Sequence, residues 1–197
     1  LVISLGGIGS FDGGAGMLQA LGATFYDDEA QIVDMRKGAY LIKYIRRIDL
    51  SGVHPQLTKV NIQLMSDFSS RLYGKKSEIM QTYESLDLSQ NEAAEIDNLI
   101  WYFSELFKNE LKIAMGPIER GGAGGGIAAV LNSLYQAEIL TSHELVNQIT
   151  HLENLIQQAD LIIFGEGLKE EDQILETTTI RIAELTQQYS KPAIAIC

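Results

Sequence analysis

The sequence is poor in cysteine, in basic side chains and in long apolar runs. Its one cysteine, Cys197, excludes an internal disulfide, which is typical of proteins in a reducing cytosol. Lys and Arg number 15 against 26 Asp and Glu, and the net charge of −11 argues against nucleic-acid partners and anionic membranes. We find no signal peptide and no apolar run long enough to cross a bilayer. We therefore expect a cytoplasmic protein.

The chain is long and apolar enough to fold around a substantial core. Of its 197 residues, 46% are hydrophobic, which excludes wholesale disorder. We expect a single α/β domain over residues 1–197. The sequence starts inside one strand-like run, 1–5, and stops inside another, 192–197, so we also expect it to be a fragment of a longer chain.

The first 22 residues, LVISLGGIGSFDGGAGMLQALG, predict a buried strand, a glycine-rich loop and a helix. Glycines permit positive φ and close approach of a ligand to main-chain amides, and a helix N-terminus suits a phosphate or carboxylate. Asp12 in this loop is either a helix cap or a catalytic group. The spacing matches neither GxGxxG nor GxxxxGK[ST], so this pattern alone does not identify a nucleotide loop.

Further glycine-rich and acidic positions follow other predicted strands or precede helices. Residues 120–126 lead directly into a helix pattern, which favours ligand contact or close backbone packing over a linker. Residues 160–164 predict a buried strand that ends in Gly165-Glu166-Gly167. Asp67 follows a strand predicted over 59–65, at the end where parallel sheets bind ligands, although it could equally cap the next helix.

The other segments indicate the fold class. A hairpin is predicted from 23–26 and 31–35, and helical spacing over 37–48 carries basic residues that are either a solvated face or a contact for an anion. Capping boxes at 89–92 and 141–144 start two helices, the second with an apolar face over 145–159. Strands alternate with helices. We therefore expect a layered α/β fold with a mostly parallel sheet flanked by helices and glycine-rich loops at one edge.

Three stretches together resemble the bacterial glycerate kinases of the two-domain type. Residues 6–22 are similar to that family's GGSATNDGGAGMxQALG, residues 122–126 to its GAGAAGG loop, and residues 159–167 with Lys191-Pro192 to its ADLVITGEG … KP segment. Weaker similarities lie at 48–52 and 66–68. The chain departs from the family in Ile8 and Phe11, where the family has Ser and Asn, and in Ser70-Arg71, where it has Asn-Pro.

The resemblance implies one domain of a two-domain kinase that phosphorylates glycerate with ATP and Mg²⁺. It gives Asp12 and Asp67 as catalytic residues and names no metal ligand. The implied substrate- and nucleotide-binding residues are Gly6, Gly7, Gly13, Gly14, Gly122, Gly125, Gly126, Gly165, Glu166 and Gly167. The implied partners are glycerate, the second domain of the same chain and, as a possibility, a second copy in a homodimer. The alternative is a catalytically silent relative that binds a small acid or a nucleotide.

Overall fold

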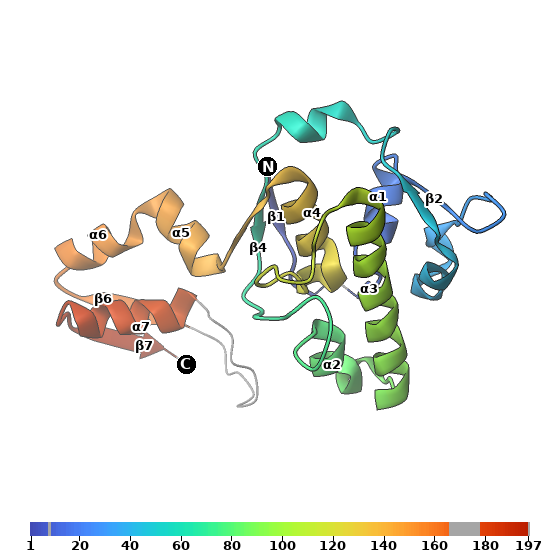
Figure 1. Ribbon diagram of the computed structural model, residues 1–197. Helices are drawn as coiled ribbons and strands as arrows, with labels where there is room; N and C mark the ends of the chain where they lie inside the picture. The colour runs from blue at the N-terminus through green and yellow to red at the C-terminus, as the bar shows by residue number, and fades with distance from the viewer. Residues whose placement is uncertain (8, 166–177, 197) are drawn as a thin grey trace. The chain divides into compact units, whose positions relative to one another are not determined.

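The computed structural model describes residues 1–7, 9–165 and 178–196 (Figure 1). The chain divides into two compact units, Leu1–Ile139 and Leu140–Cys197, each of which is described by itself. The expectation of a single domain over residues 1–197 stays a prediction. No helix in the described ranges is both long enough and apolar enough to cross a bilayer.

Helices and strands alternate along the chain. The strands are β1 (Val2–Ser4), β2 (Thr24–Tyr26), β3 (Arg47–Asp49), β4 (Gln63–Met65), β5 (Glu138–Leu140), β6 (Ile162–Gly165) and β7 (Ala193–Ile196). The α-helices are α1 (Ala15–Ala20), α2 (Glu78–Thr82), α3 (Gln90–Leu111), α4 (Ile127–Tyr135), α5 (Ser142–Thr150), α6 (Leu152–Gln158) and α7 (Thr178–Gln188). Short 3₁₀ helices are η1 (Met35–Lys37), η2 (Ala39–Tyr44), η3 (Pro55–Lys59), η4 (Tyr83–Leu86) and η5 (Ala123–Gly126).

A three-stranded sheet with the order β1-β4-β5 positions the glycine loops of the first unit. β1 and β4 are parallel, with Val2 opposite Gln63 and Ser4 opposite Met65. The amide of Leu5 continues the ladder by donating to the Met65 carbonyl at 2.9 Å. The strands predicted over 1–5 and 59–65 are therefore present as the shorter neighbours β1 and β4, and their carboxyl ends lie at the same edge. The burial predicted for the first of them is not observed, since Val2 is 51% exposed.

Two apolar clusters hold the first unit together. The smaller joins the sheet to α4 through buried residues that include Leu5, Leu64 and Leu131. The larger surrounds α3, where Phe103 packs edge-to-face on Phe25 and Phe107 with ring centroids 5.7 and 5.0 Å apart. Such aromatic pairs add to the stabilisation that area burial provides. The long helix α3 therefore anchors β2 and the 3₁₀ segments to the core.

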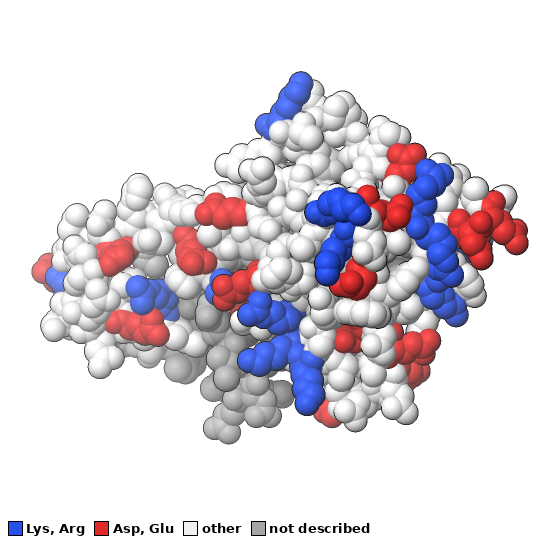
Figure 2. All heavy atoms as spheres, in the orientation of Figure 1, with Lys and Arg blue, Asp and Glu red and all other residues white. Residues whose placement is uncertain are grey.

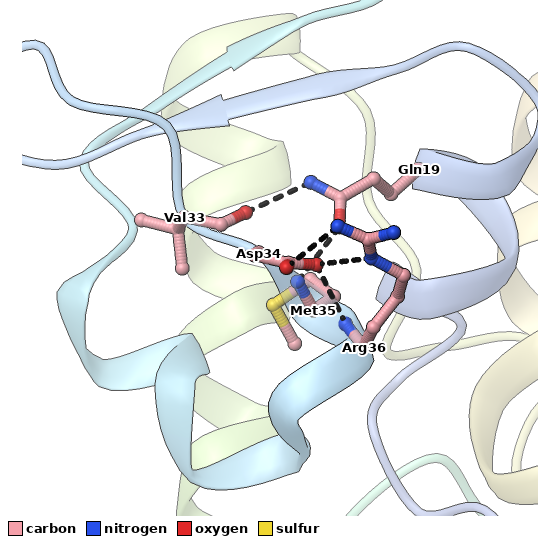
Figure 3. A network of polar contacts seen from close by, with 5 residues as sticks. All are labelled: Gln19, Val33, Asp34, Met35 and Arg36. Carbon is pink, nitrogen blue, oxygen red and sulfur yellow. Dashed lines mark hydrogen bonds and ion pairs between the residues drawn. The ribbon is translucent and has the colours of Figure 1, made fainter.

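The predicted hairpin of 23–26 with 31–35 is only partly formed, and the full antiparallel partner of β2 is β3. Residues 31–35 form no strand, although Ile32 makes an isolated bridge with Tyr26 and the Val33 amide donates to the Phe25 carbonyl at 2.9 Å. The side chain of Gln19 explains why: its Nε2 donates to the Val33 carbonyl at 2.8 Å and its Oε1 accepts from the Met35 amide at 2.7 Å (Figure 3). These contacts satisfy main-chain groups that a strand ladder would otherwise use.

The helix predicted over 37–48 is wrong. The chain forms two short 3₁₀ helices, η1 and η2, and then the strand β3. Ile42, Ile45 and Ile48 are buried at a spacing of three, which a 3₁₀ turn followed by a strand satisfies as well as an α-helix does. The Arg46 amide donates to the Tyr26 carbonyl at 2.7 Å, so pairing with β2 decides the conformation.

The second unit contains a two-stranded parallel sheet, in which β6 pairs with β7 from Ile162 opposite Ala193 to Gly165 opposite Ile196. The helix predicted with a continuous apolar face over 145–159 is broken into α5 and α6 at His151, which has φ 52°. The burial predicted for the strand over 160–164 is not observed, since the side chain of Ile163 is 61% exposed. With the parallel pairings and flanking helices of both units, the expected α/β fold class is confirmed.

Candidate functional site

The candidate site of the first unit begins at the carboxyl edge of β1 and β4. Gly6 and Gly7 follow β1, and Ser66 and Asp67 follow β4. Because the two strands are parallel and in register, these four residues leave the sheet at the same edge. Gly6 and Gly7 are exposed, Ser66 is buried and Asp67 is half-buried. This is the edge at which parallel α/β sheets bind ligands.

The first and second glycine loops touch through their main chains. The Gly13 amide donates to the Gly125 carbonyl at 2.9 Å. A Cβ atom on Gly125 would lie 1.7 Å from the Ser10 carbonyl oxygen, and one on Gly126 would lie 2.6 Å from the Gly13 Cα. Gly125 also has φ 63°, in the left-handed region. Only glycine permits this approach, so the predicted convergence of these two loops is observed.

The segment after Asp67 packs on the second glycine loop from another direction. The Gly122 amide donates to the Ser70 carbonyl at 3.2 Å. A Cβ on Gly122 would lie 2.1 Å from the Arg71 carbonyl oxygen and 2.7 Å from Ser70 Oγ. That hydroxyl is buried and has no hydrogen-bond partner in the structure. Three segments far apart in sequence, 10–14, 66–71 and 120–126, are thus linked around one glycine loop.

Asp12 bonds to the start of α1 through its carboxylate, while Gly14 occupies the N-cap position. Its Oδ1 accepts from the Gly14 amide at 2.9 Å and its Oδ2 from the Gly16 amide at 2.8 Å. These bonds satisfy two of the donors that a helix N-terminus leaves unpaired. The Asp12 carboxylate therefore makes capping contacts without being the N-cap residue, while the catalytic alternative stays a prediction.

Most of the glycines predicted to bind ligand use their amides internally. The amides of Gly13 and Gly122 are bonded as described above, the Gly14 amide donates to Asp12, and the Gly126 amide donates to the Gly122 carbonyl at 3.1 Å. In this arrangement the glycines provide close packing of one loop on another. By contrast, Gly6 and Gly7 have nothing within 4 Å of a Cβ position and border open space.

The third predicted glycine turn is only partly described. Gly165 ends β6 in the second unit and is exposed, whereas Glu166 and Gly167 lie outside the described residues. Within the described ranges, no group of three or more His, Cys, Asp or Glu side chains could hold a metal ion.

Glu78 contacts the second glycine loop, and the sequence analysis did not identify it. It is the first residue of α2, and its Oε2 accepts from the Gly125 amide at 3.2 Å. Burial raises the pKa of the Glu78 carboxyl above its ordinary value, while the amides of Gly125 and Gly124 oppose that shift. The capping position of Ser77 announces the start of α2, but no local pattern indicates that Glu78 reaches a loop far along the chain.

The basic residues over 37–48 form a solvated surface. Lys37, Lys43, Arg46 and Arg47 are exposed. Arg46 donates to the Tyr102 hydroxyl at 2.9 Å, and the Arg47 guanidinium lies 3.9 Å from the centroid of the Tyr26 ring. On the face of described residues that Figure 2 draws, Lys and Arg side chains are interspersed with Asp and Glu. The solvated alternative is favoured over an anion contact.

A concave region lies between α1, β2 and the segment 32–36. It has a volume of about 620 Å³ and is lined by Gly16, Gln19, Ala20, Ala23, Thr24, Ile32, Asp34 and Arg36. In Figure 3 the Arg36 guanidinium faces the Asp34 carboxylate, with Nε 2.8 Å from Oδ1 and one terminal nitrogen 2.9 Å from Oδ2. Arg36 holds the pKa of Asp34 below its ordinary value. The sequence did not indicate this pocket, because it depends on the contacts of Gln19.

The fold and the glycine loops define an α/β protein with a candidate ligand site at the carboxyl edge of β1 and β4. A profile described as the glycerate kinase family matches residues 1–197. The chain belongs to the glycerate kinase family.

Individual relatives agree with this assignment. The chain is 31% identical over 196 residues to glycerate kinase of Halalkalibacterium halodurans and 30% identical over 196 residues to glycerate 2-kinase of Escherichia coli (strain K12). Each match covers 100% of this chain and 51% of the relative. A crystal structure from Salmonella typhimurium LT2, named provisionally as glycerate kinase 2, superposes with a TM-score of 0.82 at 28% identity. That match covers 98% of this chain and 52% of the other, so the chain spans about half the length of the relatives that it matches.

Proposed function

We propose that the protein containing this chain transfers a phosphoryl group from ATP to a hydroxyl of glycerate, giving a phosphoglycerate. The observation that carries the proposal is the convergence of three loops at one sheet edge in a chain that belongs to the glycerate kinase family. Phosphoryl transfer depends mainly on positioning and on stabilising charge, which fixed loops and a few polar groups can provide. A small-molecule cleft also fits the acidic surface, which disfavours polyanionic partners.

In this proposal, Asp12 and Asp67 have different tasks. Asp12 fixes the loop between β1 and α1 through the Gly14 and Gly16 amides. Asp67, at the carboxyl end of β4, orients the glycerate hydroxyl or the metal ion. Gly6 and Gly7, which border open space, are the positions where a phosphate or carboxylate could approach the main chain.

Magnesium is the metal that we propose to accompany ATP. Mg²⁺ prefers oxygen ligands and is usually held by one or two carboxylates together with substrate phosphates, so it does not require a cluster of three acidic side chains. The carboxylate of Asp67 has the appropriate chemistry for this ion and lies at the proposed edge. The ion would neutralise charge on the phosphates during transfer.

The test is release of ADP by the full-length protein with D-glycerate, comparing wild type with Asp12→Asn and Asp67→Asn. We expect kcat/KM to fall at least a hundredfold in Asp67→Asn and at least tenfold in Asp12→Asn, since asparagine keeps an acceptor oxygen but loses the charge. Asp27→Asn is the matched control. Asp27 accepts hydrogen bonds from the amides two and four residues later, those of Glu29 and Gln31. Asp12 accepts from amides at the same two spacings, but Asp27 lies on another loop.

A catalytically silent relative is the second candidate. Internal bonding of the Gly13, Gly14 and Gly126 amides favours it, because these donors are already used. The departures at Ile8 and Phe11 from the family's Ser and Asn favour it as well. Absence of ADP release from the full-length protein, together with a melting temperature that glycerate or ATP still raises, would establish this second function and refute the first.

A further inference from the structure

Glu78 is a half-buried carboxylate directed at the second glycine loop. Its Oε2 lies 3.2 Å from the Gly125 nitrogen, which donates to it. Among the ion pairs formed by described residues, none includes Glu78, so main-chain amides rather than a cation balance its charge. A hydrogen bond to a charged acceptor is roughly twice as strong as a neutral one, so this contact holds the loop more firmly than a neutral bond would.

The loop that Glu78 holds has an unusual conformation. Gly124 and Gly125 both lie in the left-handed region, with φ 63° at each and ψ of 36° and 24°. Successive residues of this kind turn their amides toward one side and form a concavity that suits an anion. In this protein, the carboxylate of Glu78 accepts from that concavity. Gly124 and Gly125 lack a side chain that would restrict φ and ψ. A contact from another segment, here that of Glu78, is therefore needed to define their conformation.

The other side of the same peptide group reaches the predicted catalytic loop. While the Gly125 amide donates to Glu78, the Gly125 carbonyl accepts from the Gly13 amide at 2.9 Å. Gly13 immediately follows Asp12, whose carboxylate caps α1. A continuous series of contacts therefore runs from Glu78 through Gly125 and Gly13 to Asp12.

The backbone around Glu78 is fixed by independent contacts. Ile79, the next residue, is 1% exposed and belongs to the larger apolar cluster. The Ser77 hydroxyl accepts from the Met80 amide at 3.4 Å and caps α2, and the Ser77 amide donates to the Gly74 carbonyl at 2.8 Å. Glu78 thus presents its carboxylate from a well-anchored turn, and the glycine loop adapts to it.

We propose that Glu78 is a positioning residue of the candidate site, which fixes the Gly124-Gly125 turn and, through the Gly13 contact, the geometry of the Asp12 loop. This inference rests on the proposed function for its kinetic consequence, since only an active site makes that geometry relevant to turnover. The claim that Glu78 fixes the two loops does not depend on the activity. Glu78 contacts neither substrate nor metal in this role.

Amide hydrogen exchange of the full-length protein tests the structural content directly. In Glu78→Ala, we expect the amides of Gly125 and Gly13 to exchange at least tenfold faster relative to amides of the core helix α3. In Glu78→Gln, we expect a smaller increase, because the amide oxygen still accepts a bond without the charge. Ile79→Val is the matched control, because it weakens the packing of the same helix and should accelerate exchange in proportion to global stability only.

Kinetics of the same variants separate positioning from simple loss of stability. We expect kcat with glycerate to fall about tenfold or more in Glu78→Ala, to recover partly in Glu78→Gln and to stay within twofold of wild type in Ile79→Val. Unchanged Gly13 exchange in Glu78→Ala overturns the proposal, as does a kcat loss equal to that of Ile79→Val. If the wild type has no glycerate kinase activity but Gly13 exchange responds to Glu78, the proposed function fails and the positioning role stands.

Discussion

At the scale of single residues, Gly125 shows how a missing side chain allows the candidate site to form. Its main chain bonds on both sides, to Glu78 and to Gly13, and a Cβ would lie 1.7 Å from the Ser10 carbonyl oxygen. The Gly13 loop and the Gly125 loop could not move apart without breaking the hydrogen bond between them. Substitution of this glycine therefore has two costs, one from the backbone conformation and one from the collision.

These two costs can be separated by comparing Gly125→Ala with Gly7→Ala. Gly7 has φ 66°, close to the 63° of Gly125, but nothing lies within 4 Å of its Cβ position. For Gly7→Ala, we expect a loss of about 1 kcal/mol in the free energy of unfolding, which is the usual left-handed penalty. For Gly125→Ala, we expect at least about 3 kcal/mol, because backbone must shift as well. Urea denaturation measures both, and equal losses would contradict the collision.

Residue-level prediction from the sequence succeeded where the chemistry is local. An aspartate two residues before a glycine-rich helix start suggests a cap, and Asp12 has that role, with bonds to the Gly14 and Gly16 amides. Glu78 and Ser70 could not be predicted in the same way, because their neighbours Gly125 and Gly122 come from a distant part of the chain. A single sequence carries no signal of such contacts.

At the scale of elements, the capping boxes are the best-predicted features. Ser89 Oγ accepts from the Glu92 amide at 3.3 Å, and the Glu92 carboxylate accepts from the Ser89 amide at 2.8 Å. The same reciprocal pair occurs at Thr141 and Glu144. Each of these motifs spans only four residues, so the sequence contains all the information that is needed.

The capping box of α3 leads to a prediction about stability and pH. Ser89→Ala should lower the free energy of unfolding by about 1 kcal/mol, the usual cost of removing a serine cap. The hydrogen bonds from Ser89 hold the pKa of Glu92 below its ordinary value. A lowered folded-state pKa gives stability that is present above the unfolded pKa and is lost as the pH falls through the folded pKa.

Thermal denaturation of wild type and Glu92→Gln between pH 7 and pH 3 measures this effect. The melting temperature of wild type should exceed that of Glu92→Gln at pH 7, and the difference should disappear in the acidic range. Glu95→Gln, which changes an exposed acidic residue of the same helix, is the control and should show no such convergence. A difference that stays constant with pH would exclude a contribution from the charged cap.

Elements that depend on distant partners were predicted less well. The Gln31–Met35 segment has strand composition, yet it makes only one isolated bridge to β2, and Gln19 bonds the Val33 carbonyl and the Met35 amide. The apolar spacing at 145–159 is helical throughout, but His151 adopts φ 52° and ends α5. In both cases, contacts across the fold outweigh local preference, which periodicity does not record.

At the scale of the whole molecule, the chain spans about half the length of its relatives, covering 51% of the glycerate kinase of Halalkalibacterium halodurans. The fold class could be predicted, because alternating strands and helices with glycine turns admit few arrangements. Burial could not be predicted from the strand sequences alone: β6 and β7 have the apolar composition of buried parallel strands, yet Ile163, Ile194 and Ile196 are 61%, 49% and 61% exposed.

A comparison of the isolated chain with the full-length protein tests the proposed function at this scale. We expect ADP release with D-glycerate only from the full-length protein, because the proposed function assigns part of the cleft to a second domain. Mixing the chain with the separately produced remainder should restore part of the activity. Turnover by residues 1–197 alone, at a rate near that of the full-length protein, would show that the chain suffices.

The bond between Gly13 and Gly125 also has a consequence for biosynthesis. The amino-terminal loop leaves the ribosome long before its partner glycine is translated, and at typical elongation rates the delay is about five to twenty seconds. During this interval the nascent Asp12 loop lacks the contact with Gly125. Maturation of the site therefore depends on a late, long-range closure, and a nascent chain that stalls before residue 125 would carry an unfinished loop.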